Sequence, residues 1–349
     1  MKNDNKGINS QTIDFVLPWV DGSDKEWLAL KSKYQESECH LSNDPDSRGE
    51  CRFRDIGLLK YWFRSVERFA PWVNCVFFVT CGQKPDWQNE SNPKLRLIDH
   101  RDYIPADYLP TFQSNTIELN LHRIPDLSEH FVLFNDDTFL LRPVKPGFFF
   151  RKGLPVLDCD LGIPNWLGNN QIGRTVINNS GVLNRNLDVK HLVWKHIGKC
   201  TDVRNLGFAR AIKNLLSFAI NRTFIPGPFG HLPQPHLKST IEELWRTAPR
   251  VLEATSRHKF RGDDGVNQWL ACAWNLVNGR FYPANEKRRG IFCPVEKEAL
   301  PRIKSAIGSQ TIPQICFSDR DSTPELEQCV AEISGAFAKL LPEKSSFEK

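Results

Sequence analysis

The sequence predicts an α/β fold, in which helices cover a mainly parallel, doubly wound sheet. Short apolar segments with strand character alternate, along the first 145 residues, with segments whose apolar side chains recur at helical spacing. The composition is that of an ordinary globular protein, with 40% hydrophobic and 25% charged residues. A length of 349 residues is sufficient for a large buried core.

Four apolar segments of the first half are predicted to be strands of this sheet. The run from Ile13 to Val20 stops at Asp21-Gly22, as a strand that enters a turn does. Further buried strands are expected at residues 75–80, 95–98 and 131–134. Residues 56–69 and 114–124 have a helical pattern between them. We expect function at the carboxyl ends of the strands, because ligands of such sheets bind there.

The pattern changes after about residue 145. Residues 151–205 are rich in Asn and Gly and are expected to be irregular. Helices are expected at about 205–220, 240–254 and 264–277, the second opening with a capping box at Ser239 and Glu242. Residues 226–236 are too rich in proline for regular structure and predict a shaped loop. A strand at 314–317 leads into a last helix.

The sequence has no clear linker, which predicts a single catalytic domain over residues 13–345. Residues 1–12 are expected to be a flexible N-terminus. Within the domain, residues 13–145 and 310–345 would form the sheet core. Residues 146–309 would form a mostly helical elaboration that carries a histidine loop.

Charge and composition exclude several classes of protein. The net charge of +5 is too mild for a nucleic-acid-binding protein, but it suits an anionic small substrate or an acidic membrane surface. No stretch approaches the ~18–20 apolar residues of a membrane-spanning helix, and the polar first ten residues exclude a secretory signal. The ten cysteines form no C-x-x-C motif and are expected to be reduced thiols. The expected location is cytoplasmic, with peripheral attachment to the cytoplasmic face of the membrane left open.

Acidic pairs follow three of the predicted strands. They are Asp21 with Asp24, Asp136 with Asp137, and Asp319 with Asp321. Carboxylates at strand ends are well placed to hold a hard divalent cation, because Mg²⁺ takes oxygen ligands and shares them with substrate phosphates. The alternative is that these residues only cap helices and favour turns.

Histidine and arginine residues of the second half indicate phosphoryl chemistry. The proline-rich loop contains His231 and His236, and a basic cluster that ends at Arg261 follows one helix later. A histidine of near-neutral pKa can take a proton from an attacking hydroxyl, and a fixed guanidinium can stabilise a transferring phosphoryl group. The alternative is that either histidine is structural. The phosphate-binding motif G-x-x-x-x-G-K-[ST] does not occur, which excludes a Walker-type nucleotide site.

The sequence also resembles the Stealth family, which includes bacterial capsular-polysaccharide sugar-phosphate transferases and the catalytic part of the animal GlcNAc-1-phosphotransferase. Four blocks in the family's order support this resemblance. The first is Ile13-Asp-Phe-Val-Leu-Pro-Trp-Val-Asp-Gly-Ser-Asp24. The second runs from Arg54 to Val144 and contains the segments Arg64-Ser-Val-Glu67, Leu109-Pro-Thr-Phe112, His122-Arg-Ile124 and Phe134-Asn-Asp-Asp137. The third and fourth are Gly230-His-Leu-Pro233 through His258-Lys-Phe-Arg261, and Cys316-Phe-Ser-Asp-Arg-Asp321 with the following helix.

The resemblance implies a Rossmann-like, glycosyltransferase-type (GT-A-like) sheet and a sugar-phosphate transferase. Such an enzyme moves a hexose or N-acetylhexosamine 1-phosphate from a UDP-sugar to a sugar hydroxyl of an oligo- or polysaccharide acceptor, forming a phosphodiester and releasing UMP. A divalent cation, Mg²⁺ or Mn²⁺, is expected as cofactor. The implied partners exclude nucleic acid, and peripheral contact with the inner membrane or with capsule-assembly proteins stays open.

The resemblance implies roles for Asp21, Asp24, Asp136, Asp137, His231, Arg261 and Asp319, and neighbouring polar residues complete the candidate site. The catalytic candidates are His231, Asp137, Arg261 and Asp319. The substrate-binding candidates are Asp21, Gly22, Asp24, Arg64, Gln83, Asn115, His122, Arg123 and His236. The metal-ligand candidates are Asp136, Asp137, Asp319 and Asp321.

Several positions depart from the family pattern, among them Cys81, which replaces an aspartate. Ile56 and Leu58 replace polar residues, Gln234 replaces a second histidine of the loop, and Arg320 replaces an asparagine. Two other functions therefore stay open: a UDP-sugar glycosyltransferase that releases UDP, and a non-catalytic nucleotide-sugar-binding member. The donor sugar, the acceptor hydroxyl, the general base and the oligomeric state are not set by the sequence.

Overall fold

The computed structural model describes residues 12–35, 49–161, 171–221, 229–321 and 323–349. Its central sheet has the strand order β3-β2-β1-β4-β8, and every neighbouring pair is parallel except β4 with β8. These strands are β1 (Ile13–Pro18), β2 (Val76–Thr80), β3 (Leu95–Asp99), β4 (His130–Leu133) and β8 (Gln234–Leu237). The predicted α/β class and the strands predicted in the first half are therefore confirmed.

Two smaller sheets flank the central one. One has the order β10-β11-β5, formed by β10 (Ile291–Pro294), β11 (Gln314–Ser318) and β5 (Thr138–Leu140). The other has the order β6-β7-β9, formed by β6 (Phe150–Arg151), β7 (Leu154–Asp158) and β9 (Tyr282–Ala284). The strand predicted near residue 314 is thus β11, the middle strand of the β10-β11-β5 sheet. It pairs with β5, the strand that follows β4 in the chain.

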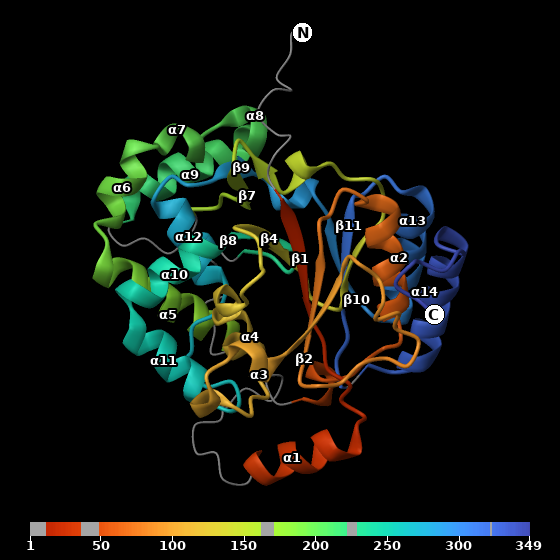
Figure 1. The fold of residues 1–349 in the computed structure, drawn as a ribbon. Helices are drawn as coiled ribbons and strands as arrows, with labels where there is room; N and C mark the ends of the chain where they lie inside the picture. The colour runs from red at the N-terminus through yellow and green to blue at the C-terminus, as the bar shows by residue number, and fades with distance from the viewer. Residues whose placement is uncertain (1–11, 36–48, 162–170, 222–228, 322) are drawn as a thin grey trace.

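Helices cover both faces of the central sheet (Figure 1). On one side lie α2 (Leu59–Phe69), α13 (Leu300–Ser309) and α14 (Leu326–Leu340). On the other lie α4 (Ser114–Leu119), α5 (Gln171–Asn186), α10 (Lys238–Thr247), α11 (Pro249–Arg257) and α12 (Trp269–Val277). Beside β7 and β9 lie four helices, α6 (Val189–Lys195), α7 (Ile197–Cys200), α8 (Val203–Leu206) and α9 (Phe208–Ile220). At the opposite end lie α1 (Lys25–Gln35) and α3 (His100–Tyr103).

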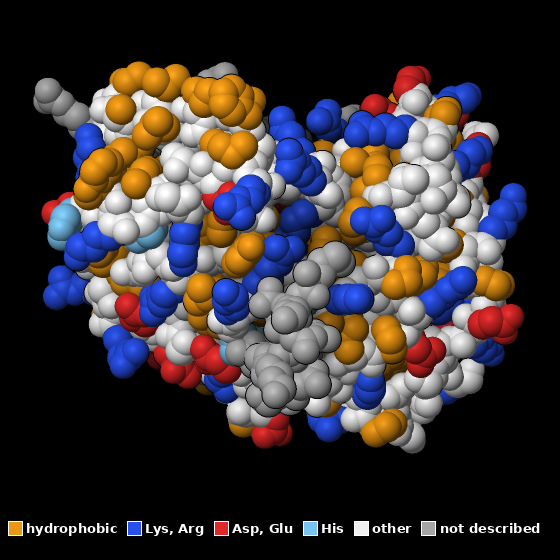
Figure 2. Space-filling model, turned by 90° about the horizontal axis from the view of Figure 1, so that it is seen from above, with side chains coloured by type: hydrophobic (Ala, Val, Ile, Leu, Met, Phe, Trp, Pro, Cys, Tyr) orange, Lys and Arg blue, Asp and Glu red, His pale blue; other side chains and the backbone are white. Residues whose placement is uncertain are grey.

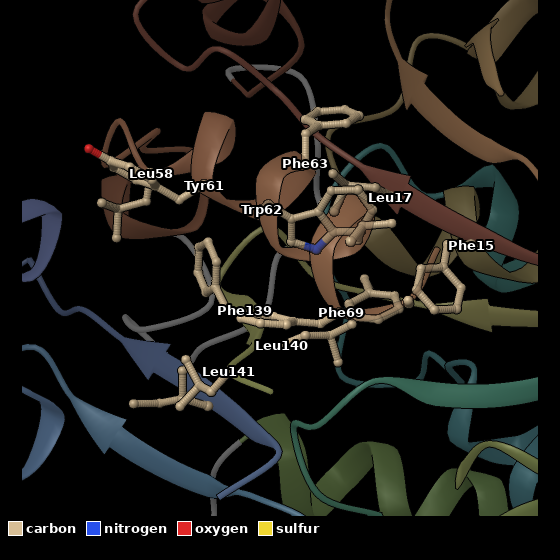
Figure 3. Close-up of a cluster of buried hydrophobic side chains, with 14 of the residues drawn as sticks. Phe15, Leu17, Leu58, Tyr61, Trp62, Phe63, Phe69, Phe139, Leu140 and Leu141 are labelled. Atoms are coloured by element: carbon tan, nitrogen blue, oxygen red, sulfur yellow. The ribbon is translucent and has the colours of Figure 1, made fainter. Parts of the chain in front are cut away.

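Alternate side chains of the central strands enter two separate hydrophobic cores. In β1, Phe15 and Leu17 belong to the core beneath α2 and α14, whereas Val16 belongs to the core beneath α10 and α12. The first core is shown in Figure 3, which labels Phe15, Leu17 and Phe69 among its buried side chains. A parallel sheet buried on both faces needs apolar residues on both, which is why its strands are near-continuous apolar runs in the sequence.

The prediction of irregular structure for residues 151–205 was wrong. Helix α5 and the helices α6 and α7 occupy much of this region. Several asparagines, which suggested loops, serve as donors within the fold instead: Asn178 Nδ2 donates to the carbonyls of Asp263 and Gly265. These bonds fasten α5 to the segment before α12, so tertiary hydrogen bonds override the weak helix propensity of asparagine.

The proline-rich loop ends in a strand that was not predicted. Residues 222–228 lie outside the described residues, but Gln234–Leu237 forms the edge strand β8, with Pro235 opposite Val132 of β4. An edge position tolerates a proline, because no further strand needs its missing N–H group.

Helix boundaries in the second half also differ from the prediction. The helix expected at 240–254 is two helices, α10 and α11, and Pro249 is the first residue of the second. Ser239 is not a cap, because α10 begins at Lys238 and the Ser239 hydroxyl donates to Glu129 instead. Gly207, at a φ of +84°, separates α8 from α9 within the helix expected at 205–220.

Two further observations concern the cysteines and the helices of the described residues. The nine cysteines of the described residues are all free thiols, and Cys39 lies outside that part of the chain. Within the same residues, we find no helix that is both long and apolar enough to cross a bilayer.

Candidate functional site

A cavity of about 310 Å³ opens at the carboxyl ends of β1 and β4. The chain turns from β1 toward β2 and β3 on one side, whereas β4 lies on the other side of β1, so this is the point where the strand order reverses. Open α/β sheets bind ligands at such a point. The predicted residues that line the cavity are Asn115, Asp136, Asp137, His231, Arg261 and Asp319.

One wall of the cavity is acidic. Asp136 and Asp137 follow β4, Asp319 follows β11, and Asp55 lies in the segment before α2. Burial, followed by the negative charges of Asp55 and Asp319, raises the pKa of Asp136 to about 7. Burial, followed by the charge of Asp136, holds the pKa of Asp137 well above its usual range. We call these four residues the acidic wall.

The acidic wall offers oxygen atoms suited to a hard cation. Asp137 Oδ1 is buried and has no hydrogen-bond partner in the described part of the chain. Arg54 forms ion pairs with both Asp319 and Asp321. Its Nη1 lies 2.7 Å from Oδ2 of Asp319, and its Nη2 lies 3.2 Å from Oδ1 of Asp321. Across the described residues, no three His, Cys, Asp or Glu side chains already converge in a geometry that could hold a metal ion. The donor set fits Mg²⁺, which usually takes one or two protein carboxylates and completes its shell with water and substrate phosphates.

The same cavity is also lined by a histidine beside two arginines, and we call His231, Arg52 and Arg261 the basic wall. The pKa of His231 is lowered by burial first and then by the charges of Arg52 and Arg261. Its ring reaches solvent, but it lies in the concavity beside Trp269 and Phe292, with ring centroids 6.1 Å and 5.0 Å away. The imidazole is therefore neutral near pH 7 and can accept a proton.

Arg261 is held in place by polar side chains of α4. Its Nη2 donates to the hydroxyl of Ser114 at 2.8 Å, and the buried carboxyl of Glu118 lies in the same cavity wall. Burial, together with the nearby charge of Arg52, lowers the pKa of Arg261 to about 10, so its guanidinium stays charged at neutral pH. A guanidinium fixed in this way presents its remaining N–H groups to an anion.

The backbone on both sides of His231 is held by two side chains, the half-buried Glu286 and the buried Gln234. The carboxylate of Glu286 accepts the N–H groups of Gly230 at 2.8 Å and of Leu232 at 3.3 Å. Gln234 Nε2 donates to the carbonyls of the same two residues, at 3.2 Å and 2.9 Å. A Cβ at position 230 would lie 2.1 Å from the Glu286 carboxylate, so a larger residue there would displace that carboxylate from the loop. Glu286 and Gln234 thus fix the histidine loop, residues 229–234.

The loop after β1 lies at the edge of the cavity, but its acidic residues Asp21 and Asp24 are not part of the cavity lining. Asp21 accepts the N–H of Ser23 at 2.9 Å, and Asp24 caps α1 by accepting the N–H of Trp27 at 2.7 Å. Gln83 exchanges two hydrogen bonds with the backbone of Asp21, at 2.9 Å and 3.0 Å. Gly22 packs so closely on the carbonyl of Phe53 that a Cβ there would come within 2.1 Å. These candidates shape the rim, and the structure assigns their side chains capping and turn contacts.

The other predicted site residues lie outside the cavity lining. Arg64 pairs with Glu348 at 2.7 Å, and the side chains of His122 and Arg123 pack against Trp245. Asp321 accepts the N–H of Cys51 at 2.6 Å. His236 is buried in β8, and its Nε2 lies 2.6 Å from Oε1 of Gln268, which does line the cavity.

Several cavity residues were missed by the sequence analysis. They are Arg52, Arg54, Asp55, Glu118 and Gln268. The first three belong to the charged run Cys51-Arg-Phe-Arg-Asp55, which has no helical or strand periodicity and therefore gave no signal beyond its charge. Glu286 lies outside the cavity lining, and nothing in its sequence surroundings indicates its contact with a loop more than 50 residues away.

The departures from the family pattern have distinct places. Ile56 and Leu58 line the cavity, and Arg320 is exposed in the turn after β11. Gln234 braces the histidine loop from within. The structure therefore gives the glutamine a supporting role that does not require a second histidine.

Comparisons with known proteins agree with the sequence motifs. The family model of Stealth protein conserved region 1 matches residues 11–39, and that of conserved region 2 matches residues 52–156. These regions contain the first two blocks described above.

Full-length relatives carry consistent names. A capsular polysaccharide phosphotransferase WcwK of Streptococcus pneumoniae is 38% identical over 97% of this chain and 99% of its own length. A receptor polysaccharide phosphotransferase WefC of Streptococcus oralis is 40% identical over 96% and 99%. An exopolysaccharide phosphotransferase cps2G of Lactiplantibacillus plantarum is 34% identical over 97% of this chain and 96% of its own length.

Among solved structures, the galactosyltransferase LgtC in complex with donor and acceptor sugar analogues is similar over 95% of this chain and 96% of its own chain. The sequence identity is 11% and the TM-score is 0.41.

Proposed function

This chain belongs to the Stealth protein family, and from that premise we propose that it transfers a sugar 1-phosphate from a UDP-sugar to a sugar hydroxyl in capsular or surface polysaccharide synthesis. The names of the relatives support a phosphotransferase. The observation in the structure that carries the proposal is that His231, Arg52 and Arg261 line the same cavity as the acidic wall.

The proposed reaction is a displacement at phosphorus. The acceptor oxygen forms a bond to the β-phosphorus of the UDP-sugar, and the bond from that phosphorus to the oxygen shared with the α-phosphorus breaks. UMP leaves with that oxygen, and the acceptor proton passes to His231. Because burial and two arginines lower its pKa, the imidazole is unprotonated and available at neutral pH.

The two arginines near His231 would bind the oxygens of the transferred phosphoryl group. Arg261 is positioned by Ser114, and Arg52 is close enough to lower the pKa of both Arg261 and His231. Charge on these oxygens is spread over the group during transfer, and guanidinium groups fixed around it stabilise that charge.

Asp136, Asp137 and Asp319 are proposed to hold a divalent cation, Mg²⁺ or Mn²⁺. When bound, such a cation neutralises charge on the two phosphates and on the departing UMP. After burial, the charges of Asp55 and Asp319 raise the pKa of Asp136, and those of Asp136 and Asp319 raise the pKa of Asp137, which supports a cluster of carboxylates that repel one another. A bound cation would offset that repulsion.

The test is to identify the nucleotide product. The purified chain is incubated with a panel of UDP-sugars, oligosaccharide acceptors and Mg²⁺, with His231→Ala as the inactive control. UMP together with a phosphodiester-linked product is the expected result and names the donor. UDP as product would make the chain a glycosyltransferase that attacks at the sugar carbon. Donor binding without either product, across the acceptor panel, would favour a non-catalytic member.

We also propose that the reaction takes place in the cytoplasm, close to the membrane. The free thiols of the described cysteines support a reducing compartment.

A further inference from the structure

Helix α9 is amphipathic, but its apolar side faces solvent and its polar side faces the protein. Its exposed side carries apolar side chains at the helical spacing i, i+4, i+7, i+8 and i+12, which are Phe208, Ile212, Leu215, Leu216 and Ile220. Phe208 and Ile220 have 70% and 76% of their surface exposed. Only Ala211 and Asn214 of the helix are buried. In a surface helix of a soluble protein the apolar stripe faces inward.

Polar side chains attach α9 to the rest of the protein. The buried Asn214 amide accepts the N–H of Leu161 and donates to the carbonyls of Cys159 and Cys200. On the same helix, Arg210 pairs with Asp158 at 3.3 Å, and Lys213 pairs with Asp160 at 2.9 Å. The apolar side is therefore directed outward by specific contacts.

Neighbouring helices extend the apolar surface. Trp194 of α6 and Val203 of α8 are 60% and 49% exposed, and the Trp194 ring stacks on Phe218 of α9 at 5.9 Å. Figure 2 shows hydrophobic side chains gathered over this end of the molecule. We call the exposed apolar side chains of α6, α8 and α9 the apolar face.

The charges around the apolar face are mostly positive. Lys190, Lys195 and Arg204 are exposed on the same helices, and Lys190 lies over the Phe218 ring at 5.7 Å. Lysine and arginine side chains border the hydrophobic area in Figure 2. Helix α9 contains no acidic residue, and Asp188 and Asp202 are engaged as the N-caps of α6 and α8. An apolar surface bordered by cations is complementary to the headgroups and acyl boundary of an anionic bilayer.

We propose that the apolar face docks on the surface of an anionic lipid bilayer. The apolar side chains of α9 and Trp194 would enter the boundary between headgroups and acyl chains, while Lys190, Lys195 and Arg204 would contact the headgroups. Attachment of this kind needs no helix that crosses the bilayer. It follows from the surface of α6, α8 and α9 and does not depend on the reaction proposed above.

The test is flotation of the purified full chain with vesicles. We expect it to bind vesicles made of equal parts phosphatidylglycerol and phosphatidylcholine, and to bind pure phosphatidylcholine vesicles at least about fivefold more weakly. The double variant Leu216→Glu/Ile220→Glu should lose at least about tenfold in affinity for the anionic vesicles. The matched control is Leu28→Glu/Leu30→Glu, which alters two residues of α1 that are each 40% exposed but lie outside the apolar face, and it should bind as the parent does.

A second variant separates the cations from the apolar side chains. Lys195→Gln/Arg204→Gln should weaken binding to anionic vesicles at least about fivefold and leave binding to neutral vesicles unchanged. Absence of binding by the parent, or equal binding by the parent and the α9 variant, would overturn the proposal. So would a dimer in sedimentation velocity that the α9 substitutions dissociate while vesicles are not bound, because the face would then be covered by a second copy of the chain. Circular dichroism verifies that each variant is folded.

Discussion

The two walls of the cavity are built by different means. The acidic wall stands mainly on the ends of β4 and β11, where the sheets themselves fix the backbone. The basic wall depends on the histidine loop, whose N–H groups are accepted by Glu286 and whose carbonyls accept from Gln234. Strand ends give a rigid set of carboxylates, whereas a braced loop can be adjusted without altering the sheet. The two walls should therefore respond differently to metal, to substitution and to pH.

Removal of divalent metal should have the largest effect and should act on the acidic wall alone. We expect EDTA to abolish transferase activity and Mg²⁺ or Mn²⁺ to restore it, because the carboxylates would otherwise repel the phosphates of the donor. The measurement is UMP release with and without chelator. Full activity in EDTA would remove the cation from the mechanism.

Substitution of one residue from each wall should separate their roles. His231→Ala and Asp137→Ala should each reduce kcat at least about hundredfold. Only Asp137→Ala should also raise the Mg²⁺ concentration needed for half-maximal rate, because only its side chain belongs to the acidic wall. Asp126→Ala, at an exposed position outside the cavity lining, is the control and should keep both values. If His231→Ala changed the Mg²⁺ requirement as strongly, the two walls would not act separately.

The same contrast explains how much could be predicted from the sequence. The strands β1, β2 and β4 are largely apolar runs, whereas β3 contains Arg96 between two apolar residues. The carboxylates that follow β4 are placed by that strand. Helix α2 was predicted for the same reason, since its buried residues repeat at helical spacing. Local pattern and final structure agree wherever burial dictates both.

The second half was less predictable because its structure depends on distant polar contacts. Asn178 of α5 bonds to residues 263 and 265, and Glu286 bonds to the loop around His231. Neither contact leaves a periodic signal, so the asparagine suggested a loop and the glutamate had no assigned role. The edge strand β8 was hidden by Pro235, which is acceptable only because of its place in the sheet.

Glu286 provides an intermediate test of the braced loop. Glu286→Gln keeps the shape of the side chain but leaves one oxygen to accept the N–H groups of Gly230 and Leu232, so one of two bonds is lost. We expect kcat to fall about tenfold with little change in KM, because His231 is misplaced while donor binding is retained. Glu242→Gln, at an exposed position of α10, should match the parent. A change in KM alone would show that Glu286 acts on binding and not on the position of the histidine.

The smallest expected effect concerns the pH dependence of stability at the acidic wall. The pKa of Asp136 is raised from 3.8 to about 7, so the folded state holds this proton more tightly than the unfolded state. The stability that this provides is complete below about pH 4 and is lost as the pH rises through about 7. An asparagine cannot ionise, so metal-free Asp136→Asn should be more stable than the parent at pH 8, by about 1–2 kcal/mol, and the difference should shrink toward pH 5.

Thermal melting in EDTA at the two pH values measures this difference, with Asp126→Asn as the control at an exposed position. An advantage of about 1–2 kcal/mol corresponds to a rise in Tm of a few degrees. Mg²⁺ at pH 8 should stabilise the parent more than Asp136→Asn, because a cation that binds the carboxylate pulls the parent toward the folded state by mass action. If Asp136→Asn gained the same stability at both pH values, repulsion among the carboxylates would not be the cause. The acidic wall would then be a set of turn residues, and its role as a cation site would lose its physical basis.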